Sequence, residues 1–159
     1  MSAQEPELVR LFLEDHKAMT RALVEVIARI EDHDMAGAQR LADELDRSAG
    51  AHIEFEEQVL YPEIGRCRGD RLEEKLRSEH RIVCHALNSL VRGRPLQLVD
   101  AVFQQEILQS LKTGLKHAEG CGTLISHLAA WPAAQQERAQ QRLLDLRARG
   151  KRWTELEYC

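Results

Sequence analysis

No stretch of this sequence is apolar over the length needed to cross a membrane. A spanning helix needs roughly 20 consecutive, mostly apolar residues, and charged side chains interrupt every apolar run of this chain well before that length. The first ten residues are acidic on balance and lack the basic and apolar regions of a signal peptide. We therefore expect no membrane partner, and we predict a cytoplasmic protein.

A basic stripe is also missing. The chain has 22 Lys and Arg against 26 Asp and Glu, which gives a net charge of −4, and the two signs are interspersed. Nucleic-acid binding depends on clustered Lys and Arg that neutralise phosphates. No nucleic-acid partner is therefore expected.

Cysteine is too scarce for a disulfide scaffold. The four present are Cys67, Cys84, Cys121 and Cys159, in a chain dominated by helix formers. Disulfide scaffolds are short, loop-rich and secreted. In a reducing compartment we interpret these cysteines as thiols, metal ligands or redox groups.

Signals for β-strands are weak. Val, Ile and aromatic residues never alternate over a useful length, whereas Ala, Leu, Glu, Gln, Arg and Lys dominate. Apolar residues recurring every three or four positions predict long helices at about 6–31, 35–65, 70–92 and 96–129, and a short one at about 133–149. Asp34 is the expected N-cap of the second helix, and Pro62 is expected to kink or end it.

Short connections between long helices make neighbours antiparallel. The predicted fold class is therefore all-α: an antiparallel up-down-up-down four-helix bundle with a short fifth C-terminal helix. A chain of 159 residues is one domain by length and can bury its own core. We expect residues 1–131 to form the bundle, and residues 132–159 to form a C-terminal helix and tail packed on it.

Groups that bind metals interrupt the apolar stripe of each long helix at one level. They are His16 on the first helix, His52 and Glu56 on the second, His80 and Cys84 on the third, and His117 and Cys121 on the fourth. Residues four apart lie one above the other on a helix, so each pair can hold one ion. At about 1.5 Å per residue, all four groups fall near one height, roughly 15 Å from the same end of an antiparallel bundle. Buried imidazoles, thiols and carboxylates are costly unless paired or coordinating, so we predict one buried metal locus.

The segment from His52 to Pro62, His-Ile-Glu-Phe-Glu-Glu-Gln-Val-Leu-Tyr-Pro, closely resembles the His-x-x-x-Glu-Glu…Leu-Phe/Tyr-Pro segment of hemerythrin-like, or HHE cation-binding, domains. The resemblance extends over roughly residues 8–128, because His16, His80 and His117 match the family's ligands on the other helices. It implies an iron cofactor. One iron would be held by His16 and His52 and the other by His80 and His117, with Glu56 as the bridge. It also implies binding or sensing of oxygen, a response to nitric oxide or redox state, or a role in iron handling.

The chain departs from this family pattern in the second metal half-site. The family usually has a second histidine where Cys84 stands and a bridging carboxylate where Cys121 or Gly122 stands. Together with His80 and His117, the two cysteines make a two-His, two-Cys set that suits tetrahedral zinc or mononuclear iron. Cys84 and Cys121 are metal ligands, a reversible disulfide or core residues. In the first two cases their sulfurs must be neighbours.

Three acidic residues and one further histidine lie near the predicted ligands. Glu14, Asp15 and Glu79 are either solvated helix-face charges or groups that orient an imidazole. His85 is the spare candidate ligand if Cys84 is not one.

The sequence leaves three functions open. The first is a metal-dependent sensor or binder of a small molecule such as oxygen or nitric oxide, with iron as the metal. The second is a di-iron or mononuclear iron oxidase or peroxide-handling enzyme, and the third is a zinc-bound or metal-free interaction bundle. The first is favoured over the enzyme because no substrate cleft, general base or extra domain is recognisable, so no catalytic residue is assigned. The missing carboxylate supports the third.

Overall fold

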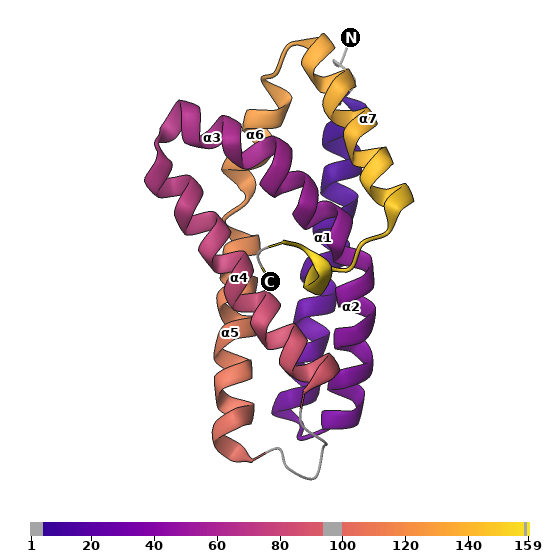
Figure 1. Ribbon diagram of the computed structural model, residues 1–159, viewed down its shortest axis with the longest axis vertical. Coiled ribbons are helices and arrows are strands. Elements are labelled where there is room, and N and C mark those ends of the chain that lie inside the picture. Colours follow the sequence, from indigo (N-terminus) through magenta and orange to yellow (C-terminus); the bar gives the residue numbers. More distant parts are fainter. Residues whose placement is uncertain (1–4, 94–99, 158) are drawn as a thin grey trace.

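Helices make up almost all of the structure (Figure 1). The computed structural model describes residues 5–93, 100–157 and 159. Its elements are α1 (Glu7–Glu31), α2 (Met35–Phe55), the π-helical turn η1 (Glu56–Leu60), α3 (Tyr61–Arg68), α4 (Asp70–Arg92), α5 (Ala101–Glu119), α6 (Gly122–Ala129), α7 (Ala133–Arg149) and the 3-10 turn η3 (Trp153–Glu155). These described residues include no strand, and the prediction of an all-α helical bundle is confirmed.

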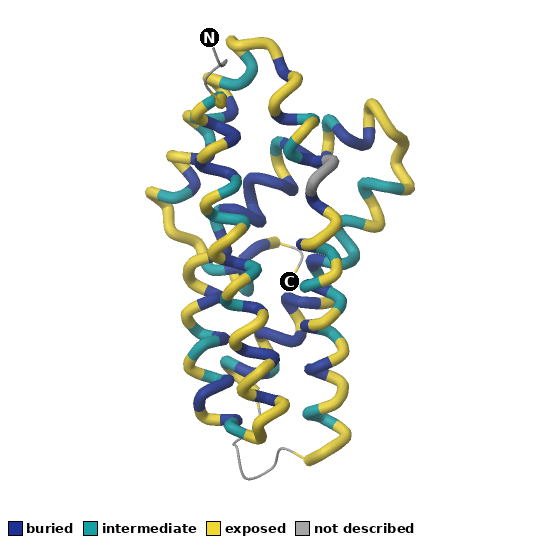
Figure 2. Tube along the Cα trace, turned by 180° about the vertical axis from the view of Figure 1, so that it is seen from behind, coloured by how far each residue is buried: buried dark blue, intermediate teal, exposed yellow. Residues whose placement is uncertain are grey.

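Four of the helices pack against one another as a bundle. α1 packs against α2 and α5, and α4 packs against the same two helices. Along the chain these helices run in alternate directions (Figure 1), and their buried positions face inward (Figure 2). The predicted N-cap of α2 is confirmed, because the Asp34 side chain accepts a hydrogen bond from Gly37 N.

The apolar core is divided into two clusters. The cluster near the α1–α2 turn includes Met19 and Leu87, and the other includes Phe12, Phe55 and Tyr61. On α1, His16 lies between Phe12 of one cluster and Met19 of the other. The polar level predicted from the sequence is therefore the boundary between the two clusters.

The helix expected over about 35–65 continues from Met35 to Arg68 but contains the π-helical turn η1. Pro62 does not end it, because it lies in the first turn of α3, where its missing N–H is tolerated. Within the turn, Tyr61 N donates to Glu56 O, five residues earlier. An i→i+5 bond places residues five apart on one face, whereas an α-helix would place residues four apart there. The turn therefore brings Tyr61 onto the face of Glu56.

The helix expected over about 96–129 is interrupted, and residues 96–99 lie outside the described residues. α5 ends at Glu119 and α6 begins at Gly122. Ala118 O, near the break, accepts hydrogen bonds from His16 Nε2 at 3.0 Å and Cys121 N at 3.2 Å. Gly120 has low helix propensity, and the contact from α1 takes up a carbonyl that an unbroken helix would use internally.

The last helix, α7, has the predicted bounds and packs on α1 and α2, and η3 packs on α2 and α4. Gly150 ends α7 in the left-handed conformation, with φ 64°. The domain boundary near residue 131 stays a prediction. Among the described residues, no helix is both long and apolar enough to cross a membrane.

Candidate metal centre

The four predicted histidines form two neighbouring pairs. The rings of His16 on α1 and His52 on α2 have centroids 5.9 Å apart, and those of His80 on α4 and His117 on α5 have centroids 4.8 Å apart. Glu56, at the start of η1, is fully buried. Its Oε1 lies 3.4 Å from His52 Nε2, and its Oε2 lies 3.0 Å from His80 Nε2. Glu56 thus presents one oxygen to each pair, which is the geometry expected of a bridging carboxylate.

Tyr61 joins Glu56, His80 and His117 as a fourth polar group at the second histidine pair. The sequence analysis did not single it out. Its hydroxyl lies 2.8 Å from His80 Nε2 and 3.2 Å from His117 Nε2, and it donates to Glu56 Oε2 at 3.1 Å. Ligand atoms of Glu56, His80 and His117 all lie within 4.8 Å of one another. Tyr61 lies in the hemerythrin-like segment from His52 to Pro62, but a regular α-helix would place it on a different face from Glu56. Only the π turn of η1 explains its position.

Two carboxylates orient the second histidine pair. Glu57 Oε1 accepts from His80 Nδ1 at 3.0 Å, and Glu79 Oε2 accepts from His117 Nδ1 at 2.6 Å. A carboxylate on Nδ1 holds the ring and leaves Nε2 directed at the site, as is common for metal-binding histidines. Glu79 is therefore an orienting group rather than a solvated helix-face charge, and Glu57 is one that the sequence analysis did not single out.

The other two acidic residues do not hydrogen-bond to the histidines. Glu14 forms an exposed ion pair with Arg10. Asp15 Oδ1 pairs with Arg147 at 2.8 Å, while its Oδ2 lies 3.9 Å from His52 Nδ1, which is too long for a hydrogen bond. Glu14 is thus a surface charge, and Asp15 approaches His52 without holding it.

The charges around His80 favour a cation in the cluster. Burial lowers the pKa of His80, but its hydrogen bonds to Glu56 and Glu57 outweigh this and raise the pKa to about 9. Burial raises the pKa of Glu56, yet His52 and His80 lower it well below its usual range, so this carboxylate stays ionised. Burial, followed by the charge of Glu56, raises the pKa of Tyr61. A bound metal would take the place of the proton that His80 carries.

The first histidine pair carries unsatisfied polar atoms. The buried side-chain atoms without a hydrogen-bond partner among the described residues are Asp15 Oδ2, His16 Nδ1, both ring nitrogens of His52, Glu54 Oε2 and Glu56 Oε1. Burial lowers the pKa of His16, so its imidazole is neutral and Nδ1 can bind a metal. Such orphaned atoms are costly. A cation between His16, His52 and Glu56 would satisfy three of these six atoms, namely His16 Nδ1, one His52 nitrogen and Glu56 Oε1, so the residues present fit a metal.

Of the three alternatives for Cys84 and Cys121, a disulfide between the two is wrong. Cys84 forms a disulfide with Cys159, with Cα atoms 5.8 Å apart, and therefore offers no thiolate to a metal. Cys121 is a buried free thiol whose Sγ donates to His117 O at 3.4 Å. The two-His, two-Cys set is thus not assembled, and a ligand role for Cys121 stays a prediction. His85, the spare candidate, is exposed on α4.

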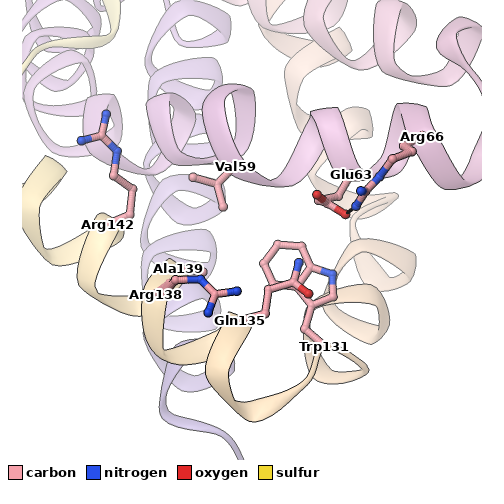
Figure 3. Close-up of a pocket in the computed structure, with 8 residues that line it drawn as sticks. All are labelled: Val59, Glu63, Arg66, Trp131, Gln135, Arg138, Ala139 and Arg142. Atoms are coloured by element: carbon pink, nitrogen blue, oxygen red, sulfur yellow. Dashed lines mark hydrogen bonds and ion pairs between the residues drawn. The ribbon is translucent and has the colours of Figure 1, made fainter.

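A surface pocket reaches the cluster at His16. His16 lines an open pocket of about 540 Å³ with Thr20, Val24 and Ala118 among its other walls. A second open pocket, of about 460 Å³, lies elsewhere, between Val59 and Glu63 on one side and Trp131 and the α7 arginines on the other (Figure 3). None of the predicted ligands lines that pocket. The first pocket therefore offers a route from solvent to His16.

The chain matches the family model of the hemerythrin HHE cation-binding domain over residues 7–148. No curated protein and no solved structure matches it. The match covers all four histidines, Glu56 and most of α7, and it confirms the resemblance inferred from the sequence. The chain belongs to the hemerythrin HHE cation-binding domain family.

Proposed function

We propose that this protein holds non-haem iron at the histidine cluster and uses it to bind or sense a small molecule such as oxygen or nitric oxide, or to respond to redox state. The observation that carries the proposal is the position of Glu56, whose two oxygens face different histidine pairs. A buried carboxylate in that position suits a bridge between two ions.

The donors divide into two half-sites. One would use His16, His52 and Glu56 Oε1, three groups with unsatisfied buried atoms. The other would use His80, His117 and Glu56 Oε2, with the Tyr61 oxygen as a further donor within reach. If a bound metal ionised it, Tyr61 would supply a negatively charged oxygen to the half-site that lacks the family's carboxylate from the fourth long helix.

The donor set favours iron over zinc. Imidazole, carboxylate and phenol oxygen suit iron. The disulfide at Cys84 removes one of the two thiolates that favoured structural zinc. Iron would supply a redox-active Lewis acid. Few protein donors per half-site leave coordination positions for a diatomic ligand, and the pocket at His16 offers a route to them. A cytoplasmic location and the lack of a nucleic-acid partner remain predictions from the sequence.

Metal analysis tests the proposal. Protein produced with added iron and purified without chelators should carry two irons per chain, and His52→Ala should lose most of them. His127→Ala is the matched control, because His127 lies on α6 away from the cluster. Equal losses in the two variants, or zinc in place of iron after iron supplementation, would contradict the assignment. Titration of the reduced protein with nitric oxide then tests ligand binding, and an unchanged optical spectrum would exclude it.

A further inference from the structure

The segment that follows α7, residues 150–157 and 159, turns back across the middle of the bundle (Figure 1). We call it the strap. Trp153, only 3% exposed, meets the ring of His80 edge-on, with centroids 5.8 Å apart. A small cavity, about 10 Å³, is lined by His80 and Glu57 together with Trp153, Leu156 and Cys159 of the strap. The strap therefore covers the side of His80 that carries its orienting carboxylate.

Contacts with α2 position the strap. Asp46 is fully buried, and its carboxylate accepts from Thr154 N at 2.8 Å, Thr154 Oγ1 at 2.9 Å and Arg152 at 3.3 Å. At Gly50 the strap backbone lies so close that a Cβ would overlap Lys151 O. These contacts place the strap but, unlike a covalent bond, they open and close reversibly.

The covalent attachment is the disulfide from Cys84 to Cys159. Cys84 lies one helical turn after His80 on α4 and is 1% exposed, whereas Cys159 is exposed. The bond thus joins an exposed residue to a buried one, and both cysteines line the small cavity beside His80. Exposed disulfides are the ones that exchange readily with external thiols.

We infer that Cys84–Cys159 is a thiol-exchange site that fastens the strap over His80 when oxidised and releases it when reduced. The thiolate of a low-molecular-weight thiol or a dithiol protein attacks Cys159 Sγ and forms a mixed disulfide there. The Cys84–Cys159 bond breaks, and its electron pair leaves on Cys84 Sγ, which takes up a proton. A second reductant thiol attacks the mixed disulfide and frees Cys159 as a thiol. The products are two protein thiols and one oxidised disulfide of the reductant.

The effect on the metal rests on the proposed function, whereas strap release does not. Iron-loaded protein is prepared oxidised and after dithiol reduction. Loss of iron to an excess of a competing chelator and hydrogen exchange at the Thr154 amide are then measured in both. Reduction should increase the rate of iron loss and the rate of Thr154 exchange roughly ten-fold or more, because a disulfide commonly shifts an opening equilibrium by at least that factor. Cys159→Ser should behave like reduced protein under both conditions.

Cys67→Ser is the matched control, since Cys67 is exposed and free, and it should keep the difference between oxidised and reduced protein. Equal Thr154 exchange in oxidised and reduced protein overturns the strap release. Faster Thr154 exchange with unchanged iron loss overturns the link to the metal. A chain that binds no iron in either state refutes the proposed function, but Thr154 exchange still decides whether the strap is released.

Discussion

Removing the Tyr61 hydroxyl is the most direct test of how the centre is built. Tyr61→Phe keeps the ring in the apolar cluster but deletes an oxygen that lies 2.8–3.2 Å from three candidate ligand atoms. Tyr61 is fully buried, so no solvent can replace the hydroxyl without rearrangement.

In metal-free protein, the hydroxyl donates to the ionised Glu56 carboxylate. Hydrogen bonds to charged groups contribute about 1.5–3 kcal/mol, so Tyr61→Phe should lower the free energy of unfolding by about 2 kcal/mol. For a domain of this size that corresponds to a fall in Tm of about 4–8 °C. Thermal melts in the presence of chelator measure it. Thr113→Val is the control, because its hydroxyl lies on an exposed helix face, and it should change the free energy of unfolding by less than about 0.5 kcal/mol.

In iron-loaded protein, a Tyr61 phenolate bound to ferric iron would give a visible charge-transfer absorption that Tyr61→Phe abolishes. Wild-type protein with bound ferric iron and no such band, or a band that survives in Tyr61→Phe, would refute Tyr61 as a ligand. An unchanged Tm in the metal-free variant would refute the hydrogen-bonding argument separately.

Two further predictions each test a single contact. Glu79 accepts a hydrogen bond from His117 Nδ1, and losing a carboxylate that orients a metal-binding histidine commonly weakens metal binding by about 10–100-fold. Glu79→Gln should therefore weaken iron binding by that factor, as measured by chelator competition, with the helix content by circular dichroism unchanged; wild-type affinity would mean that His117 needs no orienting group. The pKa of Asp34 is lowered from its usual 3.8, chiefly by the hydrogen bond that its carboxylate accepts from Gly37 N. The ionised carboxylate therefore stabilises the fold above that pH, and this contribution is lost as the pH falls through the lower pKa of the folded state. Asp34→Asn should therefore reduce the loss of stability on the acid side, as followed by urea midpoints from pH 5 to 2, and an identical acid-side slope would contradict this.

The sequence by itself determined the helices and the level of the metal-binding groups. The helices 70–92 and 133–149 have the predicted bounds, because local propensity and glycines beyond their ends set them. His16, His52, Glu56, His80 and His117 interrupt apolar stripes of long helices, and helical rise together with antiparallel packing is enough to bring them to one height.

Only the tertiary structure decided which neighbours these groups have. Tyr61 joins the cluster through a π turn, whose i→i+5 bond no periodicity reveals. The break near Gly120 coincides with a hydrogen bond from His16, about a hundred positions earlier in the chain, to Ala118 O. Cys84 was matched to Cys121 because both stand four residues after a histidine, yet its partner is Cys159. Spacing along a helix sets the direction in which the Cys84 side chain points. Its partner is determined by the path of the strap, which Asp46 fixes through its hydrogen bond from Thr154 N.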